Sequence, residues 1–487
     1  MNSPDNLEIS ILTFNCWGLK YLAKFRSERL AEIGRCIASA DPVPQIVGLQ
    51  ECWTHQDYQS VRRETRHILP FGKLYHSGIF GAGLAILSKW PIEESSMIRY
   101  PLNGRPTAFF RGDWFVGKGI AHASLRYGTD ASEIIEVFNT HLHAPYEREP
   151  NDSYICHRTA QAWEMSKLLR GAVKRGHLVV GLGDFNMLPN SLAHRLITTH
   201  APVYDLWLSS HPESALGAAG DEAGIAQRKL LPTAESNIVE NGTTCDSVYN
   251  TWRWEKSQQK LLGPNCPLIE VPRDKIDLKA KRLDYIFASS ISSSISPKNN
   301  NSWSITSIKV GMMSRHPMLQ CSLSDHFSVE ATLSKKRKNT SLEDEDGTKD
   351  NDSALPSSLS NENYASNECK SFLPLNVYDE VLGLISQYRI RERRQRKLRL
   401  SHFVCSFLLT LICLLVVWWA PRNFVTFVLL LVSTFGLSAG VIDGLIGGLF
   451  IGSEIRALKE FEWEIRNARA QACGEVHFVM DESITDW

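Results

Sequence analysis

The spacing of hydrophobic and polar positions divides this chain into three zones. Residues 1–333 alternate apolar, strand-like runs with helix-like stripes and short punctuating loops. The helix expected between the first two strands has Ser27 as its N-cap and an apolar stripe through Leu30 and Ile33. Residues 334–372 are polar, low in complexity and too poor in apolar side chains to form a packed core. We therefore expect a folded α/β domain over 1–333 and a disordered polar linker over 334–372.

The third zone is apolar enough to cross a membrane twice. Phe403 to Ala420 is a run of about 18 residues without a charge, close to the length that a bilayer core requires. After Pro421-Arg422-Asn423, a second run extends from Phe424 to Ile451, and the short break between the runs allows only a tight hairpin. The pattern predicts a basic juxtamembrane segment, two transmembrane helices and a C-terminal tail, over 373–400, 401–453 and 454–487.

Basic residues flank both apolar runs on one side. Residues 389–399 carry seven basic side chains and one acidic side chain, and Arg456 and Lys459 follow the second run. By the positive-inside rule, both flanks face the cytosol, and so do the large domain and the tail. The basic cluster over 389–399 would then lie against anionic phospholipid headgroups. The N-terminus lacks a basic region followed by a long apolar run, so we expect no signal peptide.

Glycine recurs at every fourth position of the second apolar run, at Gly436, Gly440, Gly444, Gly448 and Gly452. This spacing lines one helix face with glycine and permits the close approach of another backbone. We expect that face to pack on the first helix of the same hairpin, and homo-oligomerisation is the alternative. A charge in lipid is costly, so Asp443, beside the stripe, should face a partner or lie near the membrane surface.

Polar side chains of acid–base or metal-ligand type follow the strand-like runs of the first zone. Singly, such residues are usually turn residues or partly buried side chains. Strands whose polar tips meet at a common edge, however, are the way in which an α/β sandwich builds a site. The tips are Asn15, Glu51, His141, Asp184 with Asn186, Asp284 and Asp325-His326.

This set combines oxygen ligands with histidines. The acids and amides offer the oxygen atoms that Mg²⁺ prefers, at Glu51, Asp184, Asp325, Asn15 and Asn186. His141 and His326 can transfer protons near neutral pH. Phosphoryl chemistry needs both charge neutralisation at phosphorus and activation of a water molecule. The sequence has no cysteine ligand set for zinc and no nucleophile elbow for acyl transfer.

The charge and the cysteine content of the chain disfavour some classes of function. The 487 residues carry 53 basic and 53 acidic side chains, and residues 1–333 are nearly neutral, with 35 basic and 33 acidic side chains. A DNA-binding groove needs a clear basic excess, so a nuclease and nucleic-acid partners are disfavoured. The 11 cysteines form no CxxC pair, which indicates reduced, buried thiols in a cytosol-facing protein.

Six motifs resemble, in order, those of the DNase I-like endonuclease/exonuclease/phosphatase superfamily. They are Thr13-Phe14-Asn15, Gln50-Glu51, Asn139-Thr140-His141-Leu142, Gly183-Asp184-Phe185-Asn186, Arg282-Leu283-Asp284-Tyr285 and Ser324-Asp325-His326. They span residues 13–327, essentially the whole first zone. The resemblance implies a four-layered α/β sandwich of two packed mixed sheets flanked by helices, followed here by the C-terminal two-helix transmembrane hairpin.

Within that superfamily the chain is most similar to the membrane-bound neutral sphingomyelinases and the fungal inositol phosphosphingolipid phospholipases C. The similarity rests on the hairpin and on Phe14-Asn15-Cys16-Trp17-Gly18, Gln50-Glu51-Cys52-Trp53 and His141-Leu142-His143-Ala144-Pro145-Tyr146. It implies Mg²⁺-dependent, in-line attack of water on the phosphodiester of a sphingolipid in the membrane. The products would be ceramide and a phosphorylated headgroup.

Three questions stay open at this point. Phosphocholine and phosphoinositol substrates share the phosphodiester, and only the linker and the chain length lean towards the inositol phosphosphingolipid enzymes. A phosphoinositide phosphatase of the same fold and a catalytically inactive membrane scaffold are the alternative functions. The endoplasmic reticulum is the expected location for such a hairpin, with mitochondria as the alternative.

The resemblance also assigns roles to individual residues. Glu51 would bind Mg²⁺ with Asn15 nearby, and Asp184 and Asn186 would position the phosphate and the attacking water. His326 would be the general base, held by Asp284 and aided by Asp325. His141 would stabilise the transition state or protonate the leaving group. His143, two residues further along, is the alternative for this role.

The segment Gly112-Asp113-Trp114-Phe115-Val116-Gly117-Lys118-Gly119 matches the spacing of a phosphate-binding loop up to its lysine. Gly119 replaces the final Ser or Thr, and bulky side chains fill the loop, so nucleotide binding is disfavoured. The family that the chain resembles carries a similar segment, which implies that Asp113 and Lys118 contact substrate or anionic lipid. Trp114 and Phe115 are either core residues or residues that enter the membrane interface.

Overall fold

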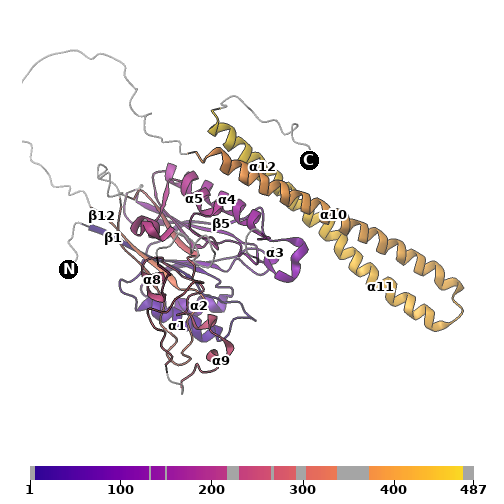
Figure 1. The fold of residues 1–487 in the computed structure, drawn as a ribbon, viewed down its shortest axis with the longest axis horizontal. Helices are drawn as coiled ribbons and strands as arrows, with labels where there is room; N and C mark the ends of the chain where they lie inside the picture. Colours follow the sequence, from indigo (N-terminus) through magenta and orange to yellow (C-terminus); the bar gives the residue numbers. More distant parts are fainter. Residues whose placement is uncertain are drawn as a thin grey trace, which may run out of the picture.

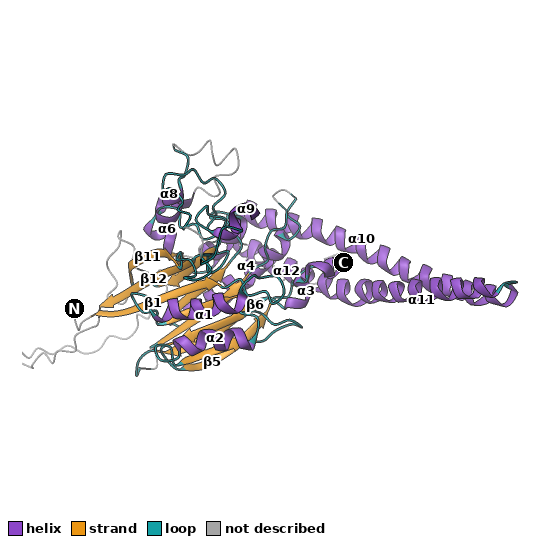
Figure 2. Cartoon of the chain, turned by 90° about the horizontal axis from the view of Figure 1, so that it is seen from below, coloured by secondary structure: helices purple, strands orange, loops and turns teal. Residues whose placement is uncertain are grey.

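In the computed structural model, two six-stranded sheets pack face to face and helices cover their outer faces (Figures 1 and 2). The structure describes residues 6–130, 133–147, 151–215, 230–264, 268–291, 303–336 and 372–474. The expected fold class is confirmed: a four-layered α/β sandwich is followed by two long apolar helices that form a candidate hairpin. Most of the expected linker, residues 337–371, lies outside the described residues.

The first sheet has the strand order β11-β12-β1-β2-β4-β3. Its strands are β1 (Asn6–Asn15), β2 (Ile46–Gln50), β3 (Phe71–Tyr75), β4 (Leu84–Ser88), β11 (Ser304–Gly311) and β12 (Ser328–Lys336). β1 and β2 run parallel, and the other neighbouring pairs of this sheet are antiparallel. β12 continues past the expected domain end at residue 333, because Lys336 pairs with Asn6 at the start of β1.

The second sheet has the order β5-β6-β7-β8-β10-β9. Its strands are β5 (Ile92–Arg99), β6 (Gly119–Arg126), β7 (Ile134–His141), β8 (Leu178–Asp184), β9 (Val203–Asp205) and β10 (Asp284–Ser289). Here β7 and β8 are the parallel pair, and their neighbours are antiparallel. Each sheet therefore has one parallel pair near its centre, flanked by antiparallel strands.

Apolar layers hold the domain together. Ile11, Ile86, Val137 and Leu182 belong to the layer between the two sheets. A second layer joins the first sheet to α1 (Arg26–Ala38) and α2 (His55–Thr65), and a third joins the second sheet to α4 (Ile155–Lys174) and α5 (Leu192–His200). Strands buried on both faces explain the nearly continuous apolar runs in the sequence. The shorter elements are η1 (Pro106–Arg111), α3 (Asp113–Val116), α6 (Leu206–Ser210), η2 (Pro212–Ala215), α8 (Ala234–Val239), η3 (Thr251–Arg253) and α9 (Lys256–Gln259).

The apolar stripe expected for α1 is confirmed, but the expected N-cap is wrong. Leu30 and Ile33 are buried in the layer beneath the first sheet. The helix begins at Arg26, and Phe25 occupies the cap position with a left-handed backbone (φ 50°) and no capping side-chain bond. The buried guanidinium of Arg29 donates to the carbonyl oxygen of Lys24 at 2.8 Å. A local bond from the Arg29 side chain therefore holds the chain entering α1, in place of a Ser27 hydroxyl.

Two long helices project from the domain as an antiparallel hairpin (Figures 1 and 2). The C-terminal elements are α10 (Leu375–Val416), η4 (Val417–Trp419), α11 (Asn423–Leu445), the π-helical turn η5 (Ile446–Phe450) and α12 (Ile451–Ala472). Both helical stretches are long and apolar enough to cross a membrane. The juxtamembrane segment expected over 373–400 is the first part of α10, continuous with the apolar run. We call this part of α10, residues 375–400, together with α12, the stalk.

Within the hairpin, the glycine face meets the first helix. A Cβ added at Gly440 would lie 2.5 Å from the Cβ of Ser406, and one at Gly444 would lie 3.0 Å from the ring of Phe403. Asp443 forms ion pairs with Arg399 and with His402, the latter at 2.7 Å. The first helix of the hairpin therefore covers the middle of the glycine face of the second. Asp443 faces two basic side chains of the same chain.

The stalk docks on α4 and α5 through an apolar seam that encloses a buried polar cluster. Glu454 of α12 accepts a hydrogen bond from the Tyr388 hydroxyl at 2.5 Å and lies 3.0 Å from Nε2 of His157 on α4. Glu392 of α10 pairs with Arg391 beside it. Burial raises the pKa of Glu454 to about 7, and burial together with repulsion from Glu454 raises the pKa of Glu392 to about 7. Burial lowers the pKa of His157 to about 3, so this ring is neutral.

We expect the stalk to dock less tightly as the pH rises. When it is docked, Glu454 keeps its proton up to a pH of about 7, whereas in an undocked, exposed stalk it loses the proton near its ordinary pKa of about 4.3. Docking is therefore strongest below that ordinary pKa and weakens as the pH rises through about 7, where a charge must be buried. Amide hydrogen exchange in α12, corrected for the intrinsic rate, should accelerate over this range.

The variant Glu454→Gln provides the control for this pH effect. The amide keeps an oxygen that can accept from Tyr388 but has no titrating charge. Most of the pH dependence of α12 exchange should disappear in this variant. If it persists unchanged, another group governs docking.

Candidate active site

The polar tips predicted from the sequence converge at one edge of the two sheets. Asn15 ends β1 in register with Gln50 at the end of β2, and His141 ends β7 in register with Asp184 at the end of β8. Asp284 begins β10 directly opposite Asp184. The carboxyl ends of parallel strands share a sheet edge with the amino ends of their antiparallel neighbours. This topology places the acids, amides and histidines together.

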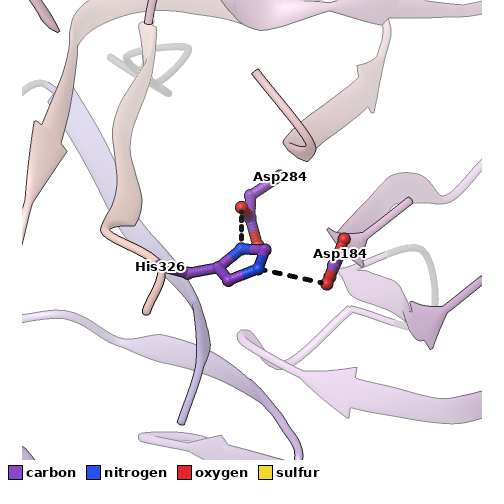
Figure 3. A group of neighbouring side chains, drawn as sticks. All are labelled: Asp184, Asp284 and His326. Carbon is purple, nitrogen blue, oxygen red and sulfur yellow. Dashed lines mark hydrogen bonds and ion pairs between the residues drawn. The ribbon is translucent and has the colours of Figure 1, made fainter. Parts of the chain in front are cut away.

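His326 lies between two carboxylates at the centre of this edge (Figure 3). Its Nδ1 is 2.8 Å from Oδ2 of Asp284, and its Nε2 is 3.8 Å from Oδ2 of Asp184. The hydroxyl of Thr244 donates to the same Asp284 oxygen at 2.5 Å. Because Asp284 accepts from Nδ1, Nε2 is the ring atom that is left to face the site.

Burial and charge set the protonation states of this pair. Burial by itself lowers the pKa of His326, but the acidic groups around the ring, Cys245, Asp284 and Asp184, outweigh it and raise the pKa well above its usual value. Burial raises the pKa of Asp184 to about 7, although His326 opposes this shift. The site therefore holds more negative charge than its own cations balance, and its groups compete for protons.

Asn15 links Asp184 to Glu51. Its Nδ2 donates to Oδ2 of Asp184 at 3.0 Å and to Oε1 of Glu51 at 3.3 Å. Glu51 has a left-handed backbone (φ 54°) directly after β2. Burial, followed by repulsion from Asp325, raises the pKa of Glu51. Its Oε2 is buried and has no hydrogen-bond partner among the described residues, so this oxygen needs a proton or a cation.

Two groups of side chains offer ligand atoms to a cation. Asp184, Asp284 and His326 place one ligand atom each within 4.8 Å of one another. Oδ2 of Asp284 already accepts from Thr244 and His326, whereas its Oδ1 is buried without a partner among the described residues. This set also includes a ring nitrogen, and a hard cation prefers oxygen to nitrogen. Oε2 of Glu51 is buried and unpartnered, with Asn15 and Asp184 beside it. The geometry therefore favours a cation at Glu51 over one between Asp284 and His326.

The structure separates His141 from His143. Nε2 of His141 lies 3.5 Å from Oδ2 of Asp184, within the carboxylate cluster. His143 is fully buried elsewhere, stacked on Tyr154 at 4.9 Å with its Nδ1 3.7 Å from Oδ1 of Asp113. Burial, followed by the charge of Lys118, lowers the pKa of both rings well below the usual value. His141 is the one that shares the site with His326.

The remaining predicted residues line the margin of the site. Nδ2 of Asn186 and Nζ of Lys118 donate to the carbonyl oxygen of Leu142, each at 3.2 Å. Burial lowers the pKa of Lys118, while the negative charges of Asp113, Glu51 and Asp184 oppose that shift.

The two other acids among the predicted residues have local hydrogen-bond partners. Asp113 accepts from the hydroxyl of Tyr146 at 2.8 Å and lies on the side of His143. Asp325 accepts from the hydroxyl of Ser324 at 3.2 Å. The charge of Asp325 contributes to the raised pKa of Glu51, whereas Oδ1 of Asp113 lies 3.7 Å from Nδ1 of the buried His143.

A polar bridge between the two sheets was not predicted from the sequence. Nε2 of Gln50 donates to Oδ1 of Asn139 on the second sheet at 2.7 Å and to the hydroxyl of Thr13 at 3.0 Å. Nδ2 of Asn139 donates back to the carbonyl oxygens of Leu49 and Ala85, both at 3.0 Å. These bonds fix the strand ends of the two sheets relative to each other. A buried amide inside each apolar run was the signal that could have revealed them.

Arg29 also supports the site and was missed. Its buried guanidinium donates to the carbonyl oxygens of Cys16, Trp17 and Leu323, at 3.1, 2.8 and 2.6 Å. It therefore joins the loop after β1 to the segment that carries Asp325 and His326. A single arginine on an amphipathic helix ordinarily indicates an exposed face, so this role could not be predicted from the sequence.

Comparison with known proteins places the chain among hydrolases of this architecture. The "Endonuclease/Exonuclease/phosphatase family" matches residues 12–326. The Schizosaccharomyces pombe protein "Inositol phosphosphingolipids phospholipase C" is 38% identical over 463 residues, covering 95% of this chain and 94% of its own. The Saccharomyces cerevisiae protein of that name is 34% identical over 489 residues, covering 94% and 90%. Human "Sphingomyelin phosphodiesterase 2" is 34% identical over 210 residues, covering 43% and 48%.

Proposed function

Since the chain belongs to the endonuclease/exonuclease/phosphatase family, within its inositol phosphosphingolipid phospholipase C and neutral sphingomyelinase group, it is a phosphoric diester hydrolase, and we propose sphingolipids as its substrates. The proposed products are ceramide and a phosphorylated headgroup. The observation that carries the proposal is the similarity to the S. pombe protein over 95% of the chain. The matched region extends beyond the catalytic domain and therefore includes C-terminal sequence.

In the proposed reaction, water attacks phosphorus in line with the bond to the ceramide oxygen. Nε2 of His326 takes the water proton, and Asp284 at Nδ1 holds the ring and stabilises the imidazolium. The bond between the water oxygen and phosphorus forms as the bond between phosphorus and the ceramide oxygen breaks. Neutral His141 donates a hydrogen bond to the phosphoryl group, and the departing ceramide alkoxide takes its proton from water. Asp184, Asn186 and Asp325 orient the phosphate and the water.

We propose Mg²⁺ as the ion of this site, held by Glu51 with Asn15 beside it. The donors are oxygens, and the unpartnered Oε2 of Glu51 gives a cation a buried anionic ligand. When bound, Mg²⁺ supplies charge neutralisation at the phosphate and favours the unprotonated form of His326 that the reaction needs.

Headgroup release from lipid tests this function. Full-length protein in detergent with Mg²⁺ is given inositol phosphosphingolipid or sphingomyelin, and ceramide is measured. Ceramide should form, faster from inositol phosphosphingolipid, because the two relatives that match almost the whole chain bear that name. Folded protein that releases ceramide from neither lipid would refute the proposal. Phosphate release from a phosphoinositide under those conditions would favour the phosphatase alternative.

We also propose that α10 and α11 cross the membrane of the endoplasmic reticulum with the catalytic domain on the cytosolic side. Basic residues on both flanks support this orientation. Part of the basic cluster is engaged internally, as Arg389 pairs with Glu462 and Arg399 with Asp443. The exposed members, which we propose to contact anionic phospholipids, are Arg393, Arg394, Arg396 and Lys397. Homo-oligomerisation through the glycine face stays a prediction.

A further inference from the structure

Four large apolar side chains are exposed where the hairpin leaves the catalytic domain. Ile79 and Phe80 precede β4 and are 70% and 60% exposed, and Phe109 and Phe110 in η1 are 54% and 76% exposed. We call these four side chains the apolar rim. Single exposed apolar side chains are common on soluble domains, but a group of them on adjoining loops marks a surface that contacts something apolar.

Backbone contacts join the loop of Ile79 and Phe80 to α3, which directly follows η1 in the chain. The amides of Ile79 and Phe80 donate to the carbonyl oxygen of Phe115, at 2.8 and 3.2 Å, and the rings of Phe80 and Phe115 are 5.7 Å apart. Gly78 has a left-handed backbone (φ 57°), and a Cβ there would lie 2.6 Å from the carbonyl oxygen of Val116. The chain is therefore built to bring this loop against α3 while leaving the apolar side chains in solvent.

The apolar rim lies at the level where the hairpin changes from charged to apolar sequence. Thr107 in η1 accepts from Arg391 at its hydroxyl (3.4 Å) and from Arg399 at its carbonyl oxygen (3.5 Å). Arg399 is the last basic residue before the apolar run that starts at Phe403. Trp114 packs on Phe450, at the end of the other apolar run, with ring centroids 4.5 Å apart. Both views show α3 beside the base of the hairpin (Figures 1 and 2).

The apolar rim is also continuous with the active site. Phe115, which anchors Ile79 and Phe80, is separated from Lys118 by only Val116 and Gly117. Nζ of Lys118 donates to the carbonyl oxygen of Leu142, which also accepts from Nδ2 of Asn186 at the margin of the site. A membrane that touches the apolar rim would therefore also lie close to the site that must receive a lipid phosphodiester.

We propose that the apolar rim inserts into the interfacial zone of the cytosolic leaflet, as a second membrane contact besides the hairpin, and holds the active site over the substrate headgroup. This inference rests on the proposed function and on the cytosolic orientation. Aromatic and branched aliphatic side chains gain free energy when they leave water for this zone. Continuity with the hairpin favours lipid over a protein partner, because η1 and α3 already contact α10 and η5 where the apolar runs begin and end.

Depth-dependent quenching tests the insertion directly. The full chain is reconstituted in phosphatidylcholine bilayers with brominated acyl chains, and a coumarin-bearing amino acid replaces Phe110 or, as the control, Val239. Val239 is 53% exposed at the end of α8, which lies away from the hairpin in both views (Figures 1 and 2). Quenching at position 110 should exceed that at position 239 several-fold. Equal quenching at the two positions would overturn the proposal and would indicate that a protein, not lipid, covers the apolar rim.

A pair of charge variants tests the consequence for catalysis. Phe110→Asp should lower hydrolysis of sphingolipid in bilayers roughly tenfold relative to hydrolysis of a short-chain, water-soluble analogue, because a charge opposes insertion. Val239→Asp should leave the ratio of the two rates unchanged. An equal loss on both substrates in Phe110→Asp would contradict the insertion. A wild-type chain that hydrolyses neither substrate would refute the proposed function, whereas the quenching experiment would still report on insertion.

Discussion

Replacing His326 by alanine is expected to lower ceramide release by about 10³-fold at neutral pH. The substitution removes the Nε2 atom that takes the water proton, and it leaves Oδ2 of Asp284 bonded only to Thr244. Single-turnover kinetics in saturating lipid should show the loss in the chemical step, with little change in lipid binding. The unfolding temperature should confirm that the variant is folded.

Two further variants make this result specific. Asp284→Asn keeps the size of the side chain but removes the negative charge beside Nδ1, so it should lower the rate by at least about a hundredfold. His67→Ala changes an exposed histidine at the end of α2 and should leave the rate unchanged. If His326→Ala retained more than a tenth of the wild-type rate, another group would be the base, and His141 would be the first candidate.

Replacing Glu51 by glutamine is expected to abolish both Mg²⁺-dependent hydrolysis and the stabilisation of the fold by Mg²⁺. At about a hundredfold excess over its Kd, an ion that binds only the folded state raises the free energy of unfolding by about 2.7 kcal/mol. Wild-type protein should show a shift of this order, measured by thermal or chemical unfolding with and without Mg²⁺. Glu51→Gln should show little shift, because the buried anionic ligand at Oε2 is gone.

The stability of Glu51→Gln in the absence of Mg²⁺ provides an independent test of the same site. Burial raises the pKa of Glu51, so its charged form is destabilised in the folded chain, and an amide removes that cost. Without Mg²⁺, Glu51→Gln should therefore be at least as stable as wild-type protein at neutral pH. Glu94→Gln, an exposed acid on β5, should behave as wild type. If Asp284→Asn alone removed the Mg²⁺ shift, the ion would lie between Asp184, Asp284 and His326 instead.

The local sequence was sufficient to locate the strand ends that carry the site residues. Asn15, His141 and Asp184 each terminate an apolar run, and the structure places each of them at the end of a strand. Parallel pairing of β1 with β2 and of β7 with β8 then aligns those ends without further information. The order of the motifs identified the family, and two uninterrupted apolar runs identified the hairpin, because both are properties of the chain read one segment at a time.

Contacts between distant segments required the tertiary structure. Alternation along a strand puts residues two apart on the same face, so it could not separate His141 from His143; β7 ends at His141, and only the packing of His141 near Asp184 and of His143 on Tyr154 distinguished them. The start of α1 depends on Arg29, whose partners lie directly after β1 and after residue 320.

The partners of side chains in the hairpin and the tail also required the tertiary structure. The sequence showed a costly acid at Asp443 but not its partners Arg399 and His402 on the facing helix. It indicated a C-terminal tail after the second apolar run but not the docking of that tail on α4 around Glu454 and His157.

The sequence by itself therefore determined the class of fold, the set of catalytic candidates and the two apolar helices. The tertiary structure decided which histidine faces the carboxylates, how the stalk is held and which apolar side chains stay exposed beside the hairpin. The physical reason is that periodicity along a strand or helix reports which side chains share a face. The chemistry of a buried group depends on what lies across that face, and such neighbours come from segments far apart in the chain.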